Sequence, residues 1–244
     1  MDLHVGTSGW HYKHWRDDFY PHGLPAARWF EYYARIFDSV ELNASFYRQP
    51  KPAAWDLWRS EAPPGFLFAV KASRYITHIR RLAVEPTSLQ LLYGGARRLG
   101  DHLGPFLYQL PPTFRRDAAN ARRLEAFLEL LPRDLAHVFE FRHESWFTGA
   151  TYEALDAHGA GLCAFHMPGL EAPLRVTGGL LYMRFHGSGE RYGGNYPDDE
   201  LQRWAGRLRS AARDARHAFI YFNNDIGGHA PRNALRLREL LANG

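Results

Sequence analysis

The chain has 244 residues, of which 45% are hydrophobic and 23% charged, and its formal net charge is +4. This composition is typical of a globular domain, and no run approaches the ~18 apolar residues of a membrane span, so we expect no membrane partner. The mild positive charge favours anionic ligands without indicating nucleic acid by itself. Cys163 is the single cysteine, which excludes an internal disulfide. Because MDLHVGTSGW does not resemble a leader, we expect a cytoplasmic protein.

Eight strand-like segments follow one another along the chain, and most are separated by helix-like segments. The strand candidates are 4–8, 39–46, 66–73, 105–110, 137–142, 161–166, 180–186 and 218–224. Amphipathic or capped segments predict helices over 25–37, 117–131, 198–214 and 230–242. The connection over 167–179 is rich in Pro and Gly, so we expect no proper helix there.

This order of elements predicts an α/β protein with a single (β/α)8 TIM-like barrel over residues 1–244. Barrels of this kind have about 250 residues, which agrees with the length of the chain. We expect some crossover helices to be short or missing, notably after the sixth strand. A doubly wound open sheet is the alternative, but the sequence lacks the Gly-rich dinucleotide turn typical of that fold.

Polar side chains recur at every second position toward the ends of the predicted strands. Side chains alternate along a strand, so each polar set shares one face. Barrel strands are covered by helices outside, and this face should therefore point to the barrel axis. Barrel enzymes keep their chemistry at the C-terminal ends of the strands, so the pattern predicts a polar, charged mouth. The positions are Glu41, Asn43 and Ser45; Lys71 and Ser73; Glu140 and Arg142; Arg184 and His186; Tyr221, Asn223 and Asp225; and, singly, Gln109 and His166.

Ordered sequence blocks across nearly the whole chain resemble one family. They are GTSGW (6–10), YYARIFDSVELNASFYRQP (32–50), FAVKASRYITH (68–78), LGPFLYQLPPTF (103–114), EFRHESWF (140–147), YMRFHG (182–187), YGGNY (192–196) and YFNND (221–225). These blocks resemble the YecE-like family, also known as domain of unknown function 72. The resemblance implies a TIM-barrel-like fold and no agreed activity. The family's recurring polar positions match Glu41, Asn43, Lys71, Gln109, Glu140, Arg142, Arg184, His186 and Asn223.

One position departs from the family pattern. Similar sequences usually place an Asp where this chain has His166, in AFHMP. This departure argues against a mechanism that needs an acid from the sixth strand.

Glu41 and Glu140 are the candidate catalytic carboxylates. They could act as a general acid/base pair across the mouth. Alternatively they form internal ion pairs, because buried charges must be paired. In that case we expect Glu140 to pair with Arg142 or Arg184, and Glu41 to pair with Lys71.

Lys71 and His186 complete the catalytic candidates. Lysine contributes only three of the 30 Lys and Arg residues of the chain, at Lys13, Lys51 and Lys71. Lys71 could anchor an anion, form a Schiff base, or serve as an ion-pair partner.

The remaining candidates in the strands indicate what the ligand is like. Arg142 and Arg184, together with His186, indicate a negatively charged ligand, with a structural salt-bridge layer as the alternative. We expect Asn43, Gln109 and Asn223 to orient hydroxyl groups.

Loops at the predicted mouth add further ligand-binding candidates. The segments 186–199 and 223–233 are glycine-rich and lead into helices, as phosphate-binding barrel loops do, and Gly193 and Gly194 lie in the first. Trp10, Trp146 and Tyr47 could stack on a sugar or a nucleobase. Alternatively these aromatic side chains pack the loops over the barrel end.

Three functional hypotheses follow. The first is an enzyme, such as a hydrolase, lyase or isomerase, that binds a small anionic ligand, phosphorylated or sugar-like, at the mouth without a metal or cofactor. The second is a metal-dependent phosphodiester or abasic-site nuclease, or a nucleic-acid-binding barrel. It is suggested by Glu41, Glu140, His166, His186 and Asp225 and by arginines on loops three and four, at Arg74, Arg80, Arg81, Arg115 and Arg116. The third is a non-catalytic metabolite-binding module. The fold does not rank them, and the oligomeric state is not determined by the sequence.

Overall fold

A closed ring of parallel strands forms the centre of the molecule. The computed structural model describes residues 2–189 and 192–243. Within them, eight strands pair in parallel in the order β1, β2, β3, β4, β5, β6, β8, β9, and β9 closes the ring on β1. Their bounds are β1 Asp2–Thr7, β2 Ser39–Leu42, β3 Leu67–Lys71, β4 Leu103–Gln109, β5 His137–Glu140, β6 Gly161–Met167, β8 Leu180–Phe185 and β9 His217–Phe222. The closure confirms the predicted TIM-like barrel.

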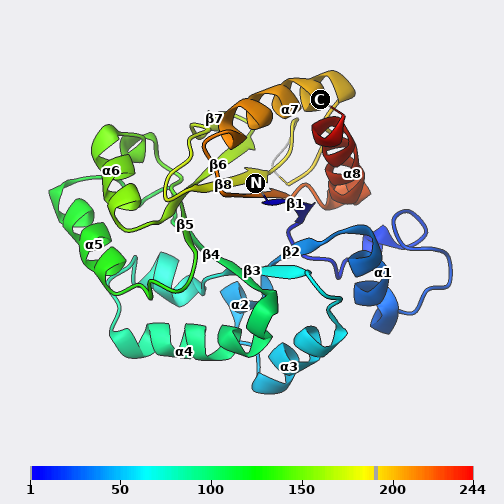
Figure 1. The fold of residues 1–244 in the computed structure, drawn as a ribbon, viewed down its shortest axis with the longest axis horizontal. Helices are drawn as coiled ribbons and strands as arrows, with labels where there is room; N and C mark the ends of the chain where they lie inside the picture. Colours follow the sequence, from blue (N-terminus) through cyan, green and yellow to red (C-terminus); the bar gives the residue numbers. More distant parts are fainter. Residues whose placement is uncertain (1, 190–191, 244) are drawn as a thin grey trace.

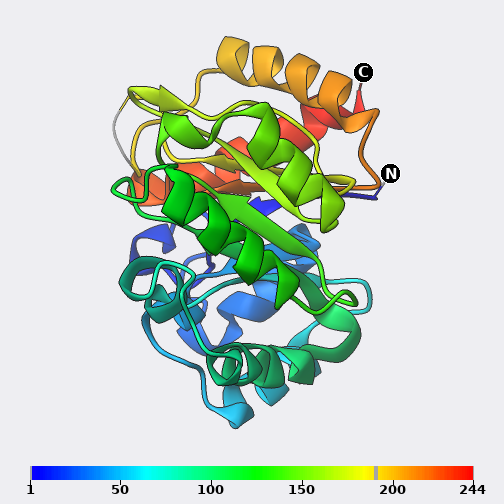
Figure 2. The same cartoon turned by 90° about the vertical axis from the view of Figure 1, so that its left-hand side faces the viewer.

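Helices surround the ring of strands, as Figure 1 shows. Their bounds are α1 Trp29–Ile36, α2 Ala44–Tyr47, α3 Pro52–Glu61, α4 Pro86–Ala96, α5 Ala118–Glu129, α6 Gly149–Ala157, α7 Asp198–Ala212 and α8 His229–Ala242. In the side view of Figure 2, α5 and α6 cover the strands that face the viewer. No helix in the described part of the chain is long and apolar enough to cross a membrane.

Local sequence explains several of these helix starts. The Asp117 side chain accepts a hydrogen bond from the Asn120 amide at 2.7 Å and caps α5. Both α3 and α4 begin with proline, whose missing N–H costs nothing in a first turn. One-turn segments lie in the connections, at Lys13–Trp15, Ala26–Arg28, Tyr75–Ile79, Arg97–His102, Glu144–Trp146 and Ile226–Gly228.

The connection after the sixth strand contains no helix, as predicted. Its regular element is β7, Leu170–Glu171, which pairs antiparallel with the end of β6. The prolines and glycines of this segment disfavour a helix, and the chain passes directly from β7 to β8.

The barrel interior is apolar at one end and charged at the other. Toward the N-terminal ends of the strands, the inward side chains form a cluster separate from the main core, made of Ala69, Leu107, Val138, Cys163, Leu180, Tyr182, Phe219 and Tyr221. Side chains two positions further along a strand return to the same face. This step places Lys71, Gln109, Glu140, Arg184 and Asn223 in the next layer, at the C-terminal mouth.

The second strand is shorter than predicted. The sequence pattern placed Asn43 and Ser45 on a strand over 39–46, but β2 ends at Leu42 and the chain turns into the short helix α2. Glu41 is therefore the last polar residue of this strand inside the barrel. The buried Ser45 hydroxyl instead donates to the Lys71 carbonyl oxygen at 2.7 Å. This bond ties α2 to the end of β3.

The contact of β1 with β2 gives a test of the fold. A methyl group added at Gly6 would overlap the Ser39 carbonyl oxygen on β2, whereas one added at the exposed Gly206 of α7 meets nothing within 4 Å. We expect Gly6→Ala to lower the free energy of unfolding by about 1–3 kcal/mol because of overpacking. Gly206→Ala should raise it by about 0.5–1 kcal/mol through helix propensity. Urea unfolding measures both, and equal effects would contradict this packing.

Candidate functional site

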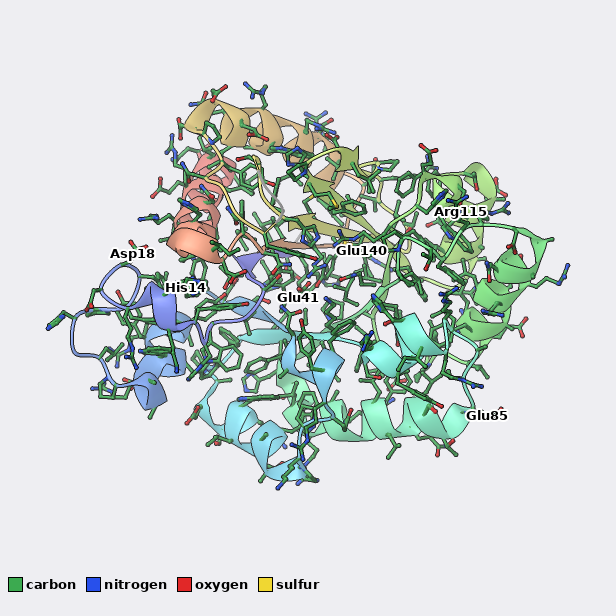
Figure 3. The ribbon with its side chains drawn as sticks, turned by 180° about the vertical axis from the view of Figure 1, so that it is seen from behind. His14, Asp18, Glu41, Glu85, Arg115 and Glu140 are labelled. Carbon is green, nitrogen blue, oxygen red and sulfur yellow. The ribbon has the colours of Figure 1, made fainter. Side chains whose placement is uncertain are left out.

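Four buried charged side chains form a continuous chain of ion pairs across the barrel mouth. We call Glu41, Arg184, Glu140 and Arg142 the mouth network. Arg184 donates through Nη2 to Glu41 Oε1 at 2.7 Å and through Nη1 to Glu140 Oε2 at 2.6 Å. Arg142 Nε donates to the other Glu140 oxygen. Figure 3 places Glu41 and Glu140 together at the centre of the ring of strands.

The remaining hydrogen-bonding capacity of the two carboxylates is also used. Ser8 Oγ donates to Glu41 Oε1 and the Tyr182 hydroxyl to Glu41 Oε2, both at 2.7 Å. The Cys163 thiol lies 3.6 Å from Glu140 Oε2. Every carboxylate oxygen of the pair thus receives at least one donor. Glu41 and Glu140 are both fully buried, so these bonds replace the water that each charge has lost.

The ionised form of the Glu140 carboxyl is strongly favoured over the protonated form. Burial raises the pKa of its carboxyl, but the guanidinium groups of Arg142 and Arg184 outweigh burial and hold this pKa well below its ordinary value of 4.5. A carboxylate in this state is not a proton donor at neutral pH. The arrangement matches the predicted ion pairs of Glu140 with Arg142 and Arg184, and it leaves Glu140 unsuited to the general-acid role.

His186 is neutral, in contrast to its expected place among the positive side chains. Its Nε2 lies 2.8 Å from Arg142 Nη2 and accepts that donor, while its Nδ1 lies 3.1 Å from the Asn223 amide. Burial, then the charges of Arg142 and Arg184, hold the pKa of His186 well below 6.5. The imidazole therefore orients Arg142 and contributes no charge.

Lys71 differs from the other mouth cations because no carboxylate pairs with it. Within the described residues, its ammonium makes no hydrogen bond and no ion pair within 4.0 Å, and it lies 4.4 Å from the centre of the Phe46 ring. The predicted Glu41–Lys71 pair is therefore wrong, because Arg184 already occupies Glu41. Burial, then Arg184, lowers the pKa of Lys71 from 10.5 to about 7, against the opposing pull of Glu41 and Glu140.

The charge balance of the mouth follows from these contacts. Two carboxylates and two guanidinium groups cancel within the mouth network. The nearby His78 is also uncharged, because burial, then Lys71, lowers its pKa to about 4. When protonated, the Lys71 ammonium is thus a positive charge for which the described residues provide no counter-charge in the inner mouth.

The predicted amide side chains lie at the edge of this network. Asn43 Nδ2 donates to the Ser8 carbonyl oxygen at 3.2 Å, while its buried Oδ1 has no hydrogen-bond partner in the described chain. Gln109, only 8% exposed, ends β4 in register with Glu140. Asn43 and Gln109 therefore both lie beside the mouth network.

Trp146 is a structural residue. It is fully buried, its ring stacks between Phe114 and Phe141, and its Nε1 donates to the Phe114 carbonyl oxygen at 2.7 Å. A ring enclosed on both faces cannot stack on a ligand, so this prediction is wrong and the packing alternative holds.

Trp10 and Tyr47 lie beside open cavities at the mouth. Trp10 is partly buried and, with Tyr12 and Asn43, lines a cavity of about 380 Å³. Tyr47 is 81% exposed and, with Phe46, lines a larger groove of about 580 Å³. Both volumes suit small ligands, so the predicted binding roles of these two rings have space for a partner.

The seventh loop is anchored by polar contacts to its neighbours. Gly194 has a φ of +78°, and its carbonyl oxygen accepts a hydrogen bond from Asn224 Nδ2 at 2.9 Å. Gly193 and Tyr196 are buried. The expected phosphate-binding segment 186–199 includes residues 190–191, which lie outside the described residues, so the predicted roles of Gly193 and Gly194 stay predictions.

The residues proposed for a metal site do not converge. His166 faces α7, where its Nδ1 lies 2.9 Å from the Tyr196 hydroxyl and its ring packs beside Trp204. In residues 2–189 and 192–243, no three His, Cys, Asp or Glu side chains are grouped as a metal ion would require. His166 therefore contributes to the contact between strand six and α7.

Three residues of the site were not predicted from the sequence: Ser8, His78 and Tyr182. Tyr182 could have been predicted, because it precedes Arg184 by two positions on the same strand face. Ser8 lies just beyond β1, in the GTSGW block. His78 lies on a short helical turn, where strand alternation gives no signal.

Arg184 provides a test of the mouth network. Arg184→Leu leaves two buried carboxylates facing one guanidinium, so we expect a loss of about 3–5 kcal/mol in the free energy of unfolding. The exposed Arg115, at the periphery in Figure 3, supplies the control Arg115→Leu, which should change stability by less than about 0.5 kcal/mol. Similar losses for both variants in urea unfolding would rule out a specific role of the network.

The uncompensated charge of Lys71 predicts a pH-dependent stability. The folded protein releases this proton near pH 7 and the unfolded chain near 10.5, so the ammonium destabilises the fold most below pH 7. We expect Lys71→Met to stabilise the protein by about 1–3 kcal/mol below pH 7, with a gain that shrinks as the pH rises toward 10.5. Lys51→Met, at an exposed site, is the control. A gain independent of pH would contradict the charge argument.

Comparison with known proteins identifies relatives of similar length. The chain is 27% identical over 270 residues to the UPF0759 protein YunF of Bacillus subtilis, covering 98% of this chain and 94% of the relative. It is 32% identical over 120 residues to the UPF0759 protein YecE of Escherichia coli K12, covering 48% of this chain and 42% of that protein.

Solved structures show the same architecture. A DUF72 family protein from Thermotoga maritima matches with a TM-score of 0.90 and 30% identity, covering 99% of this chain and 100% of the other. A second, from Enterococcus faecalis, matches with a TM-score of 0.84 and 20% identity, covering 99% and 96%, and this likeness shows the fold alone. Residues 4–244 match the family described as "Protein of unknown function DUF72", which confirms the resemblance seen in the sequence blocks. The chain belongs to the DUF72 family.

Proposed function

We propose that this protein is an enzyme that binds a small anionic ligand, phosphorylated or sugar-like, at the C-terminal mouth of the barrel, with Lys71 as its reactive group. The observation that carries the proposal is that, in residues 2–189 and 192–243, the Lys71 ammonium has no carboxylate partner, while every charge of the mouth network is neutralised. An anion bound there would supply the missing counter-charge.

Lys71 also suits proton transfer better than the two glutamates do. General acid–base catalysis works best when the pKa of the group lies near the working pH, and the pKa of Lys71 is about 7. Glu140 is held ionised, and Glu41 accepts three hydrogen bonds. We therefore assign the acid/base role to Lys71 and an electrostatic role to Glu41 and Glu140.

The surroundings of Lys71 suit a ligand larger than a simple ion. The Phe46 ring, which contacts the ammonium, also lines the 580 Å³ groove next to Tyr47. Arg48 and Arg74 are exposed on the same groove and add positive charge. A phosphorylated or carboxylated ligand with an extended body fits this combination.

The other two hypotheses make different demands. A metal-dependent nuclease requires a group of metal ligands, and its five candidate residues do not converge in the described chain. A metabolite-binding module requires no titrating amine, and the lowered pKa of Lys71 favours catalysis over binding alone.

Ligand-induced stabilisation tests the proposal. We expect inorganic phosphate or glycerol 3-phosphate to raise the melting temperature saturably, by an amount equivalent to about 2.7 kcal/mol at about 100 times Kd. The shift should disappear in Lys71→Met and persist in Lys51→Met, because Lys71 lies in the inner mouth, where no described carboxylate pairs with it, whereas Lys51 is exposed. Equal shifts in both variants would contradict an anion site at Lys71.

A further inference from the structure

We propose that Lys71 forms a covalent imine with a small anion that carries an aldehyde or ketone group, such as a 2-oxo acid or a keto-sugar phosphate. This inference rests on the proposed function for the anionic character of the ligand. It goes beyond that function by naming the reactive group of the ligand and the covalent bond that it forms.

The neutral Lys71 amine has a lone pair that is available to react. A lysine held in an ion pair stays an ammonium and has no lone pair to donate. Arg184 occupies the nearest carboxylates, with Nη2 on Glu41 and Nη1 on Glu140, each within 2.7 Å. Among the described residues, the Phe46 ring centre lies 4.4 Å from the Lys71 nitrogen, and an aromatic face does not compete for the lone pair.

The charges that face the Lys71 amine act on its pKa in opposite directions. Arg184 on β8 and Arg142 beyond β5 disfavour a further positive charge, while Glu41 on β2 and Glu140 on β5 favour it. His78, from the turn after β3, is uncharged and leaves this balance unaltered. Burial lowers the pKa of Lys71 further than either arginine does, so a large fraction of the amine is neutral near pH 7.

Lys71 lies at the end of β3 and is partly exposed as a residue, unlike Glu41 and Glu140, which are fully buried. Part of its side chain is therefore accessible from the mouth. Phe46 connects the Lys71 nitrogen with the groove that carries Arg48 and Arg74, where the anionic end of the same ligand finds positive charge.

The chemical step balances without a cofactor. The neutral amine attacks the carbonyl carbon, forming a C–N bond as the C=O π bond breaks, and a proton passes from the nitrogen to the former carbonyl oxygen to give a neutral carbinolamine. Loss of hydroxide, which takes a proton from solvent and leaves as water, forms the C=N bond. Overall, the amine, the carbonyl and one proton give an iminium ion and water. The iminium carries the same single positive charge as the ammonium, so the mouth network keeps its balance.

Reductive trapping tests this inference. The full-length protein is incubated with cyanoborohydride, which reduces an imine to a stable secondary amine, and with one of two matched probe pairs. These are pyruvate with lactate, and dihydroxyacetone phosphate with glycerol 3-phosphate, where the second member carries a hydroxyl in place of the carbonyl. Intact mass and peptide mapping then locate the adduct among the amino groups. The chain has three lysines, so Lys13 and Lys51, both exposed, serve as internal references.

We expect the carbonyl probes to label Lys71 at least tenfold faster than Lys13 or Lys51, and the hydroxyl probes to label nothing. Lys71→Arg should lose this adduct while keeping a cooperative melting transition. Labelling of Lys13 and Lys51 at the same rate as Lys71 would overturn the imine.

Thermal shifts with the same pairs separate this inference from the proposed function. Equal stabilisation by both members of a pair without an adduct would overturn the imine and leave Lys71 as an anion anchor, in agreement with the proposed function. An adduct at Lys71 without stabilisation by glycerol 3-phosphate would support the imine and contradict the anion site. No adduct and no stabilisation by any probe would overturn both.

Discussion

The guanidinium group of Arg184 is the interaction on which the mouth of this barrel depends. It is fully buried and bonds Glu41 of β2 and Glu140 of β5 at once. A buried charge is costly unless it is paired, so this pairing holds three strands that are distant in sequence against one another. It also affects Lys71. Because Arg184 bonds both carboxylates, no described carboxylate pairs with Lys71, whose pKa is lowered.

The rest of the interior supports this arrangement. Below the mouth network lies a buried, mainly apolar layer that includes Tyr182, whose hydroxyl donates to Glu41. Tyr221 in the same layer hydrogen-bonds Ser39 at 2.5 Å. A low local dielectric strengthens the mutual influence of buried charges. Preorganised charges around one titratable amine are the physical basis of the proposed chemistry, since the environment of Lys71 is built before any ligand arrives.

The barrel and the composition of its mouth could be predicted from the sequence because both follow from the alternation of side chains along the strands. Strand alternation identified the inward face that carries Lys71, Glu140 and Arg184, and the lack of a helix after β6 followed from its prolines and glycines. Local sequence patterns gave wrong predictions where the chain leaves the strands of the barrel. Asn43 begins a helical turn instead of continuing β2, and Trp146 lies in a buried aromatic stack. The end of β2 and the burial of Trp146 are both set by tertiary packing, so no local sequence pattern could predict them.

The sequence by itself determined the fold, the family and the charged strand residues of the mouth, since hydrophobic period and motif order are properties of the chain. Only the tertiary structure decided which charges are paired. Glu41 is separated from Arg184 by more than a hundred positions, and Lys71 is much nearer to it along the chain. Closure of the barrel nevertheless brings Arg184, and not Lys71, into bonding distance of Glu41. Charge pairing depends on distances across the barrel, and those distances exist only once the ring of strands has closed.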